Sequence, residues 1–348
     1  METIIADMRD GLDAGLLERA GEIIAAGGLV AFPTETVYGL GANALDENAA
    51  AKIYGAKGRP SDNPLIVHIA RMEDLYRIAA KVPEKAEALA KAFWPGPLTM
   101  IFPKADCVPY TTTGGLPTVA VRMPDHEIAL ELIKAGGGYI AAPSANTSGR
   151  PSPTEAKHVA EDMNGKIEMI IDGGSVGIGV ESTIVDMSGE TPMILRPGYI
   201  NQKMLEQVIG PVVMDPALFE AAPNVRPKAP GMKYRHYAPK AEMLIVEGKE
   251  KDVISYINDR ICRELAEGKM PGIIASEETK DRYAGGIVKS MGSRTDELSI
   301  SRHLYGVLRE FDAQKVSRIY SEAFDTPTIG QAIMNRLVKA AGHQMIHI

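Results

Sequence analysis

Cysteine is nearly missing from this sequence, since only Cys107 and Cys262 occur among 348 residues. Two cysteines so far apart in the chain exclude a disulfide framework and a cysteine-rich zinc or iron–sulfur site. Long apolar runs are missing too, because no stretch approaches the roughly 18–20 residues that a membrane span needs. The first twenty residues carry acids throughout and lack the basic-then-apolar pattern of a signal peptide. We therefore expect a cytoplasmic protein without a membrane partner.

Several common catalytic signatures are also missing. The sequence has no Gly-x-Ser-x-Gly elbow, no Cys–His nucleophile signature, no paired-histidine zinc motif and no Gly-x-x-x-x-Gly-Lys-Ser/Thr phosphate loop. Gly177-x-Gly179 begins like a dinucleotide fingerprint, but position 182 is serine and a strand is predicted next. His343 and His347 have no acid between them and stand in a tail that we expect to fray, so we predict no metal site there. Chemistry that needs a protein nucleophile or a protein-held metal is therefore disfavoured.

Charge is spread unevenly over a composition that is otherwise typical of folded proteins, with 45% hydrophobic and 24% charged residues. Residues 1–210 have a net charge of −9, residues 211–240 of +3 and residues 241–348 of −1. Nucleic acids are bound mainly through their phosphates, so the acidic first part argues against strong non-specific nucleic-acid binding. It leaves room for a local basic pocket that holds one nucleotide.

The chain divides into three parts. Residues 1–210 mix helical and strand-like periodicity, which predicts a mixed α/β domain. Residues 211–240 hold six prolines and form an extended connector. Residues 241–348 alternate strands and helices at the spacing of a smaller Rossmann-like domain with a parallel sheet. In the first domain we expect helices at 11–26, 47–56, 73–93, 125–135 and 154–163, and strands at 29–36, 65–69, 98–102, 118–122, 139–142, 168–171 and 183–187.

The segment Pro33–Asn43 reads Pro-Thr-Glu-Thr-Val-Tyr-Gly-Leu-Gly-Ala-Asn and follows a predicted strand. Hydroxyls on a strand-to-loop turn can grip a polar small molecule, and glycines let the backbone approach it closely. The plainer interpretation of the same segment is a turn with a helix cap. Spacing alone does not decide between them.

Two cations follow in Lys57-Gly-Arg59, before a loop that continues to Pro64. Gly58 and Pro60 are expected to keep this segment from being helical, and in extended backbone residues two apart point the same way. Lys57 and Arg59 are therefore predicted to converge on one polyphosphate, Arg59 with a planar fork and Lys57 as a point charge. The alternative is a solvated surface pair.

A third polar cluster lies in residues 142–152, after the strand predicted at 139–142. It gathers the side chains of Ser144, Asn146, Thr147, Ser148, Arg150 and Ser152. Loops at strand ends are where α/β sheets bind ligands. The alternative is a Ser/Thr/Pro-rich surface loop. A site with hydroxyls, Lys and Arg but no nucleophile favours attack on a nucleotide phosphate.

Together these segments resemble the YrdC-like threonylcarbamoyl-AMP synthases in their long, two-domain form. The resemblance rests on seven motifs in the family's order and covers the whole chain: Pro33–Asn43, Lys57-x-Arg59, Trp94-Pro-Gly-Pro-Leu-Thr99, Arg122-Met-Pro, Ser144-x-Asn146-x-Ser148-Gly, Glu181-Ser-Thr-Ile-Val-Asp186 and Leu195-Arg-Pro-Gly198. His236-Tyr237-Ala238-Pro239 and the C-terminal domain complete it. It implies a YrdC-like twisted open mixed sheet in the first domain.

The resemblance also implies a nucleotidyltransferase reaction. L-threonine, bicarbonate or carbon dioxide, and ATP would give threonylcarbamoyl-AMP and pyrophosphate. The product would feed the threonylcarbamoyladenosine modification next to the tRNA anticodon through a downstream tRNA threonylcarbamoyl transferase complex. Magnesium is expected on the polyphosphate, held mostly by phosphate and water. Weak RNA binding is a further expectation.

By the same resemblance, site residues can be assigned. Threonine would be held by Thr36, His68, Arg122, the backbone around Ala142, and Ser182, although spacing alone interprets His68 as a core histidine. ATP would be held by Arg59, Asn63, Thr118, Ser144, Ser152, Arg196 and Tyr237. Catalysis would rest on Lys57, Arg59, Ser144 and Asn146. Residues 211–240 would fold over ATP as a lid that carries Tyr237, because a mixed anhydride must be shielded from water.

Two other function classes stay open at the level of the sequence. One is an RNA-binding module in which catalysis is vestigial, against which the charge of residues 1–210 weighs. The other is a different carbamoyl-adenylating enzyme, or a paralogue without threonine activity. The presence of both Lys57-x-Arg59 and Ser144-x-Asn146 favours the synthase.

Overall fold

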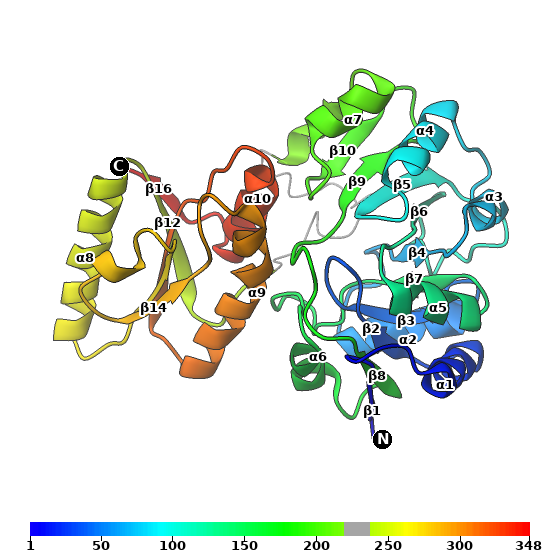
Figure 1. Ribbon diagram of the computed structural model, residues 1–348, viewed down its shortest axis with the longest axis horizontal. Coiled ribbons are helices and arrows are strands. Elements are labelled where there is room, and N and C mark those ends of the chain that lie inside the picture. Colours follow the sequence, from blue (N-terminus) through cyan, green and yellow to red (C-terminus); the bar gives the residue numbers. More distant parts are fainter. Residues whose placement is uncertain (219–236) are drawn as a thin grey trace. The chain divides into compact units, whose positions relative to one another are not determined.

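The computed structural model describes residues 1–218 and 237–348, which fold into two compact units (Figure 1). Unit 1 comprises Met1–Ser148, Ser152–Gly177 and Glu181–Tyr234, and unit 2 comprises Gly149–Pro151, Ile178–Val180 and Arg235–Ile348. Most of the predicted connector, from 219 to 236, lies outside the described residues. No helix in the described ranges is both long and apolar enough to span a membrane.

Unit 1 is built on one eleven-stranded mixed sheet, which confirms the predicted α/β class. Its strand order is β1-β8-β2-β3-β7-β4-β6-β5-β9-β10-β11, with parallel and antiparallel neighbours. The strands are β1 (Ile4–Asp7), β2 (Val30–Phe32), β3 (Gly39–Asn43), β4 (Ile66–His68), β5 (Leu98–Pro103), β6 (Thr118–Arg122), β7 (Ile140–Ala142), β8 (Met169–Asp172), β9 (Thr183–Asp186), β10 (Met193–Arg196) and β11 (Val213–Met214).

Helices cover both faces of this sheet because alternate strand residues are apolar on both sides. Val30 packs with helices α1 (Ala14–Ala25) and α5 (Glu127–Ala135) in one core, whereas its neighbour Ala31 belongs to the core on the other face. The second core contains residues of the remaining helices: α2 (Glu47–Lys57), α3 (Leu75–Ile78), α4 (Glu84–Phe93), α6 (Ala156–Met163) and α7 (Gln202–Ile209).

A smaller apolar cluster lies on the α1 and α5 face, and all its members come from strands. It contains Ile66, Ile101, Ala120, Ile184 and Leu195. Ile66 of β4 pairs with Ala142 of β7, which belongs to the α1 and α5 core, so the two clusters share a face. Beyond this small cluster the same face carries polar side chains.

Unit 2 has five parallel strands in the order β14-β13-β15-β12-β16, as predicted for a Rossmann-like domain. Its elements are β12 (Glu242–Glu247), α8 (Glu250–Ala266), β13 (Gly272–Ala275), β14 (Ile287–Ser290), α9 (Glu297–Gln314), β15 (Arg318–Glu322), α10 (Gly330–Ala340) and β16 (Met345–His347). Helix α8 lies on one face of this sheet, and α9 and α10 lie on the other (Figure 1). Single 3₁₀ turns occupy Met72–Asp74 and Lys280–Arg282 in the two units, and Pro216–Leu218 in unit 1.

Four local predictions were wrong. The strand expected at 29–36 is only Val30–Phe32, because the chain turns at Pro33, and the segment after that turn forms strand β3. The helix expected at 73–93 is interrupted before Pro83, which cannot continue a helix from the preceding turn. The C-terminal tail does not fray but adds β16 beside β12. Lys57 is not in extended backbone, because it ends α2 and Gly58 takes the left-handed conformation at φ 61°.

Candidate active site

A row of side chains crosses five adjacent strands of unit 1, and four of these strands contribute a polar member. His68 of β4 pairs in register with Arg122 of β6, and Arg122 pairs with Thr99 of β5. The row continues through Ile184 of β9 to Arg196 of β10. Residues paired across strands point to the same face, so these side chains stand side by side. All four polar members are buried, which is rare for charged groups unless they are paired.

Ser182 joins the middle of this row from the residue before β9. Its hydroxyl lies 2.7 Å from the Thr99 hydroxyl, and it accepts a bond of 3.1 Å from Arg196 Nη2. Arg196 Nε also donates to the Ser182 carbonyl at 3.0 Å. Thr99, Ser182 and Arg196 are therefore joined by hydrogen bonds, whereas His68 and Arg122 belong to the row through strand register.

His68 is the neutral member of the row. Its Nδ1 lies 3.1 Å from the Ile66 carbonyl, and its ring meets Phe32 edge-on with centroids 6.1 Å apart. Burial, together with the positive charge of Arg122, lowers the pKa of His68 to about 3. The imidazole therefore stays uncharged at neutral pH and can donate or accept a hydrogen bond without adding charge to the site.

Arg122 carries an ion pair with Glu35, a residue of the turn between β2 and β3. Arg122 Nη2 lies 2.5 Å from Glu35 Oε2, and the two side chains are 5% and 12% exposed. The turn is fixed by Thr34, whose hydroxyl donates to the Val37 carbonyl at 2.7 Å and lies 2.9 Å from that of Thr36. The predicted hydroxyl turn therefore reaches the polar row, with Glu35 as its contact.

A second polar cluster forms around the ammonium of Lys57. Lys57 Nζ donates to the carbonyls of Ser144 and Asn146, and Ser148 N donates to the Lys57 carbonyl at 2.9 Å. The Ser144 hydroxyl bonds to Asn146 Oδ1. Lys57, at 2% exposure, thus fastens the loop after β7 to the C-terminal end of α2. The two signature motifs therefore meet in space, at a Lys57 that ends a helix instead of lying in extended backbone.

Arg59 and Asn63 lie in the loop between α2 and β4. Arg59 Nη2 donates to the carbonyls of Asn63 at 3.3 Å and Pro64 at 3.0 Å. Asn63 is buried, and its Oδ1 has no hydrogen-bond partner among the described residues. Because β4 and β6 are parallel, this loop enters β4 at the same end at which Thr118 begins β6.

The predicted residues therefore gather at two ends of the same strands. Thr118 begins β6 and Arg122 ends it, so the two ends are roughly 13 Å apart at 3.3 Å per residue. At the first end lie Arg59, Asn63 and Thr118, and β7, antiparallel to β4, leads Ser144 there as well. At the second end lie His68, Arg122, Ser182 and Arg196. Ala142 ends β7 between them, opposite Ile66.

Two further predicted residues stand apart from this row. Ser152 is buried and donates to Glu181 Oε1 at 2.6 Å, next to Ser182 in the chain. Tyr237 belongs to unit 2, where its ring packs against Tyr305 with centroids 5.2 Å apart. The predicted lid falls mostly on residues 219–236, outside the described part of the chain.

Two members of the site were missed as individual residues. Thr99 lay inside a quoted motif, and only the pairing of β5 with β6 reveals that it faces Arg122. Glu35 lies in the segment Pro33–Asn43, of which only the hydroxyls and glycines were given a role. A usable signal existed for Glu35, because a single carboxylate among hydroxyls and apolar residues needs a cation when it is buried.

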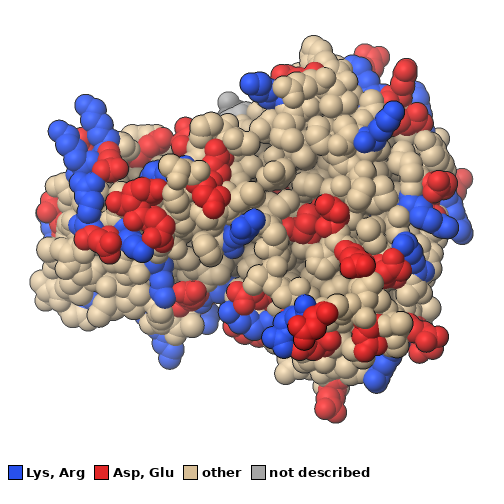
Figure 2. Space-filling view, in the orientation of Figure 1, with Lys and Arg blue, Asp and Glu red and all other residues tan. Residues whose placement is uncertain are grey.

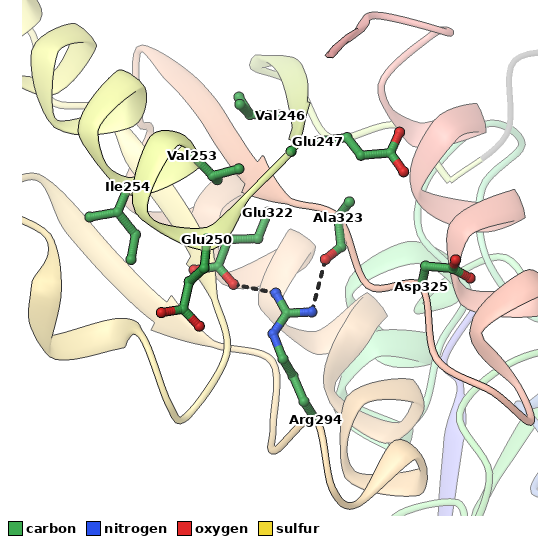
Figure 3. A pocket seen from close by; sticks show the side chains of 10 residues that line it. Val246, Glu247, Glu250, Val253, Ile254, Arg294, Glu322, Ala323 and Asp325 are labelled. Atoms are coloured by element: carbon green, nitrogen blue, oxygen red, sulfur yellow. Dashed lines mark hydrogen bonds and ion pairs between the residues drawn. The ribbon is translucent and has the colours of Figure 1, made fainter. Parts of the chain in front are cut away.

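Unit 2 has a cavity of about 310 Å³ at the carboxyl ends of β12 and β15 (Figure 3). Arg294 points into it and bonds to Glu322 Oε2 at 2.6 Å and to the Ala323 carbonyl at 3.1 Å. Glu247, Glu250 and Asp325 add negative charge to its lining. The sole arginine of this lining is thus committed to a buried glutamate.

The surface carries both signs of charge. Figure 2 shows Asp and Glu side chains scattered among Lys and Arg over the face that it draws. Within residues 1–218 and 237–348, no group of three or more His, Cys, Asp or Glu side chains is placed to hold a metal ion. Both cysteines are free and exposed.

Comparisons with known proteins give matches along the whole chain. A family model described as "Telomere recombination" matches residues 22–198, and one described as "Threonylcarbamoyl-AMP synthase, C-terminal domain" matches residues 200–342. Two relatives are named threonylcarbamoyl-AMP synthase. The one from Pyrococcus abyssi is 51% identical over 99% of this chain and 100% of its own. The one from Bacillus subtilis is 48% identical over 95% of this chain and 94% of its own.

A solved structure is similar over the same length. The crystal structure of Pyrococcus abyssi Sua5 complexed with L-threonine has a TM-score of 0.94 and 50% identity. The match covers 99% of this chain and 100% of that chain. The fold described above is therefore found in a protein that binds a free amino acid.

Proposed function

Since the chain belongs to the threonylcarbamoyl-AMP synthase family, we propose that it joins L-threonine, bicarbonate or carbon dioxide, and ATP into threonylcarbamoyl-AMP and pyrophosphate. One observation carries this proposal. Strands β4, β6, β5 and β10 bring His68, Arg122, Thr99 and Arg196 into one buried polar row, with Ser182 bonded to it. A row of one neutral imidazole, two guanidiniums and two hydroxyls suits a small amino acid that carries both a carboxylate and a hydroxyl.

We propose that threonine and ATP bind at different ends of the site. We place threonine at the end of Arg122, whose planar fork matches a carboxylate, together with Thr36, His68, the Ala142 backbone and Ser182. We place ATP at the other end and beside Arg196, with Arg59, Asn63, Thr118, Ser144, Ser152 and Tyr237 as its ligands. The roughly 13 Å between the ends suits an extended nucleotide whose α-phosphate meets the amino acid midway.

The proposed chemistry has two steps. The threonine amine first takes up carbon dioxide as a carbamate, and a carbamate oxygen then attacks the α-phosphorus of ATP while the bond to pyrophosphate breaks. Negative charge on the phosphates rises in the second step, so fixed cations and hydroxyl donors stabilise it. Arg59 and Arg196 supply the cations, and Ser144 and Asn146 supply polar groups. Lys57 acts through the loop whose carbonyls it binds.

Magnesium enters with the polyphosphate as part of the nucleotide substrate. The described residues offer no carboxylate cluster for a resident ion, whereas ATP oxygens and water satisfy the octahedral preference of magnesium. We further propose the cytoplasm as the compartment, where two free cysteines stay reduced. Residues 1–210 would act as the catalytic domain, 211–240 as a linker and lid, and 241–348 as the C-terminal domain.

The product is proposed to pass to a separate tRNA threonylcarbamoyl transferase, which places the group next to the anticodon. The net charge of −9 over residues 1–210 supports small substrates rather than tRNA as the main ligands of the site. Weak RNA binding would be detected by titrating tRNA at several salt concentrations.

The proposed function is tested by measuring pyrophosphate release from ATP with and without L-threonine and bicarbonate. We expect release to require both, and we expect L-serine or L-valine to replace threonine poorly. The variant Asp74→Asn should show the same dependence, because Asp74 is a buried acid of unit 1 that pairs with Arg71 and not with a member of the row. Release that is equally fast without threonine would overturn the proposal.

A further inference from the structure

Glu35 is the carboxylate in contact with Arg122, and nothing so far gives it a role of its own. The pair is almost fully buried, since the Arg122 side chain is 5% exposed and that of Glu35 is 12% exposed. Only one of the two carboxylate oxygens of Glu35 takes part, because Arg122 Nη2 bonds to Oε2. The backbone of the turn, with Thr34 and Thr36 bonded to each other, holds Glu35 in place.

The second oxygen of this carboxylate is buried without a hydrogen-bond partner. Among the described residues, Glu35 Oε1 accepts no bond. His126 stands close enough for the charge of Glu35 to oppose the lowering of the pKa of His126 by burial, yet no hydrogen bond joins the two side chains. A buried acceptor left unsatisfied costs about 1–3 kcal/mol, and more when it is charged. Such an atom is costly to keep unless a ligand supplies the missing donor.

The charge balance of the site indicates which kind of ligand group would donate to Glu35 Oε1. The guanidinium of Arg122 has five N–H donors. Nη2 donates to Glu35 and Nε donates to the Gly96 carbonyl at 3.4 Å, so the guanidinium keeps further donors for a substrate carboxylate. A carboxylate arriving alone would place two negative groups on one buried guanidinium. A zwitterion brings its own positive charge, and the site then holds two positive and two negative groups in alternation.

Resting on the proposed function, we propose that Glu35 binds the ammonium group of the amino-acid substrate through Oε1 while Arg122 binds its carboxylate. The Arg122–Glu35 pair is then a recognition element for the zwitterion of an α-amino acid. It selects amino acids over hydroxy acids and simple carboxylic acids, which would leave Oε1 unpaired and the site with excess negative charge.

The neighbouring residues favour this assignment over a purely structural one. His68 is neutral, with a pKa of about 3, so it does not serve as a counter-ion for a second carboxylate. Glu181, the other acid near the row, already accepts from Ser152 at 2.6 Å. A partner that only neutralised Arg122 would have both carboxylate oxygens bonded, as Glu322 has in unit 2.

The test compares two ligands in two proteins. L-threonine and 3-hydroxybutyrate both carry a carboxylate and a hydroxyl, but only threonine carries an amine. Calorimetric titration of the full chain should show wild type binding threonine far more tightly. Glu35→Gln should weaken threonine binding by about 10–100-fold and leave 3-hydroxybutyrate binding unchanged or stronger, since a charged hydrogen bond is lost only with the first ligand. ATP affinity should not change.

Control variants separate recognition from folding. Asp74→Asn makes the same chemical change in another buried acid and should not move either affinity. Glu35→Asp keeps the charge with a shorter reach, so it should retain part of the preference for threonine even if Glu35→Gln fails to fold. Equal weakening of both ligands in the Glu35 variants would overturn the inference and leave the proposed function standing. Failure of wild type to bind threonine would overturn both.

Discussion

Two glutamates, the buried Glu322 and the largely buried Glu35, are paired with arginine in different ways. Glu322 of unit 2 is 3% exposed and has both oxygens occupied, because Arg294 bonds to Oε2 while Thr279 and Tyr283 donate to Oε1. Glu35 of unit 1 is bonded by Arg122 alone and has one oxygen unpaired. We call a pair closed when both carboxylate oxygens are bonded and open when one is unpaired. A closed pair stabilises the fold, whereas an open pair keeps an acceptor that a ligand can use.

The residues around the two ion pairs also differ, and they favour a ligand at the Arg122 pair only. The Arg122 pair belongs to a row that continues through Thr99 and Ser182 to a second arginine. The Arg294 pair lines a cavity whose other charged residues are acids (Figure 3). An arginine held by a buried glutamate and ringed by acids is poorly placed to receive an anion. The comparison therefore supports the proposal that unit 1 carries the substrate chemistry and that the Glu322 network is structural.

Removing Arg122, which breaks the Arg122–Glu35 pair, should have the largest effect on activity. Arg122→Met removes the proposed partner of the substrate carboxylate and the ion-pair partner of Glu35. Threonine-dependent pyrophosphate release should fall on the order of 1,000-fold, because truncating one side of a buried charge pair costs about 2–5 kcal/mol. Arg71→Met, at an exposed arginine whose ion pair is with Asp74, is the control and should keep normal turnover. Normal turnover in Arg122→Met would remove this residue from the threonine site.

Removing Glu322 should affect stability rather than chemistry. Glu322→Leu removes the carboxylate to which Thr279, Tyr283 and Arg294 all donate, so the free energy of unfolding should fall by about 3 kcal/mol. Trp94 is the sole tryptophan and lies in unit 1, whereas far-UV circular dichroism reports both units. We expect the dichroism midpoint in urea to fall more than the fluorescence midpoint, with the KM for threonine unchanged. A raised KM would contradict a purely structural Glu322.

Because of His68, the stability of unit 1 should fall at acid pH. The folded-state pKa of about 3 lies below the unfolded value near 6.5, so the unfolded chain binds one more proton between these values. Stability is complete above pH 6.5 and is lost as the pH falls, by about 2 kcal/mol at pH 5. His68→Gln should reduce this slope by about one proton in urea titrations at several pH values. An unchanged slope would mean that His68 does not titrate this way.

Removing an exposed ion pair should have the smallest effect on stability. It would show that burial, and not ion pairing alone, determines how much a pair contributes. Arg282 and Glu250 form a contact in unit 2 with side chains 47% and 57% exposed. Arg282→Ala should change the free energy of unfolding by less than about 0.5 kcal/mol, since solvent screens such pairs. A loss comparable with that of Glu322→Leu would mean that exposure does not separate the two cases.

Much of the fold was predictable because its signals are local. The parallel alternation of unit 2 and the mixed sheet of unit 1 follow from periodicity, and the boundaries of α2 and α5 differ from the prediction by one or two residues. The errors arose where a local signal was ambiguous. Gly39–Asn43 looked like a ligand loop because it holds two glycines, yet pairing with Phe32 and its neighbours makes it a strand.

The site was predictable only in part, because its members come from strands far apart in the sequence. Motifs identified Lys57, Arg122 and Ser182, but the pairing order of the sheet decides which of them meet. That Lys57 fastens the loop of Ser144 and Asn146, rather than pointing with Arg59, depends on the helical end of α2. Glu35 and Arg122 are 87 positions apart, so the local signal at Glu35 could indicate a need for a cation but could not identify which one.

The most direct measurement is a crystal structure of the full chain with L-threonine and a non-hydrolysable ATP analogue. We expect the threonine carboxylate on Arg122, its ammonium within hydrogen-bond distance of Glu35 Oε1, and the triphosphate extending toward Arg59 and Ser144. Threonine bound elsewhere, with the Arg122–Glu35 pair untouched and the row free of substrate, would contradict the assignment of this row as the active site.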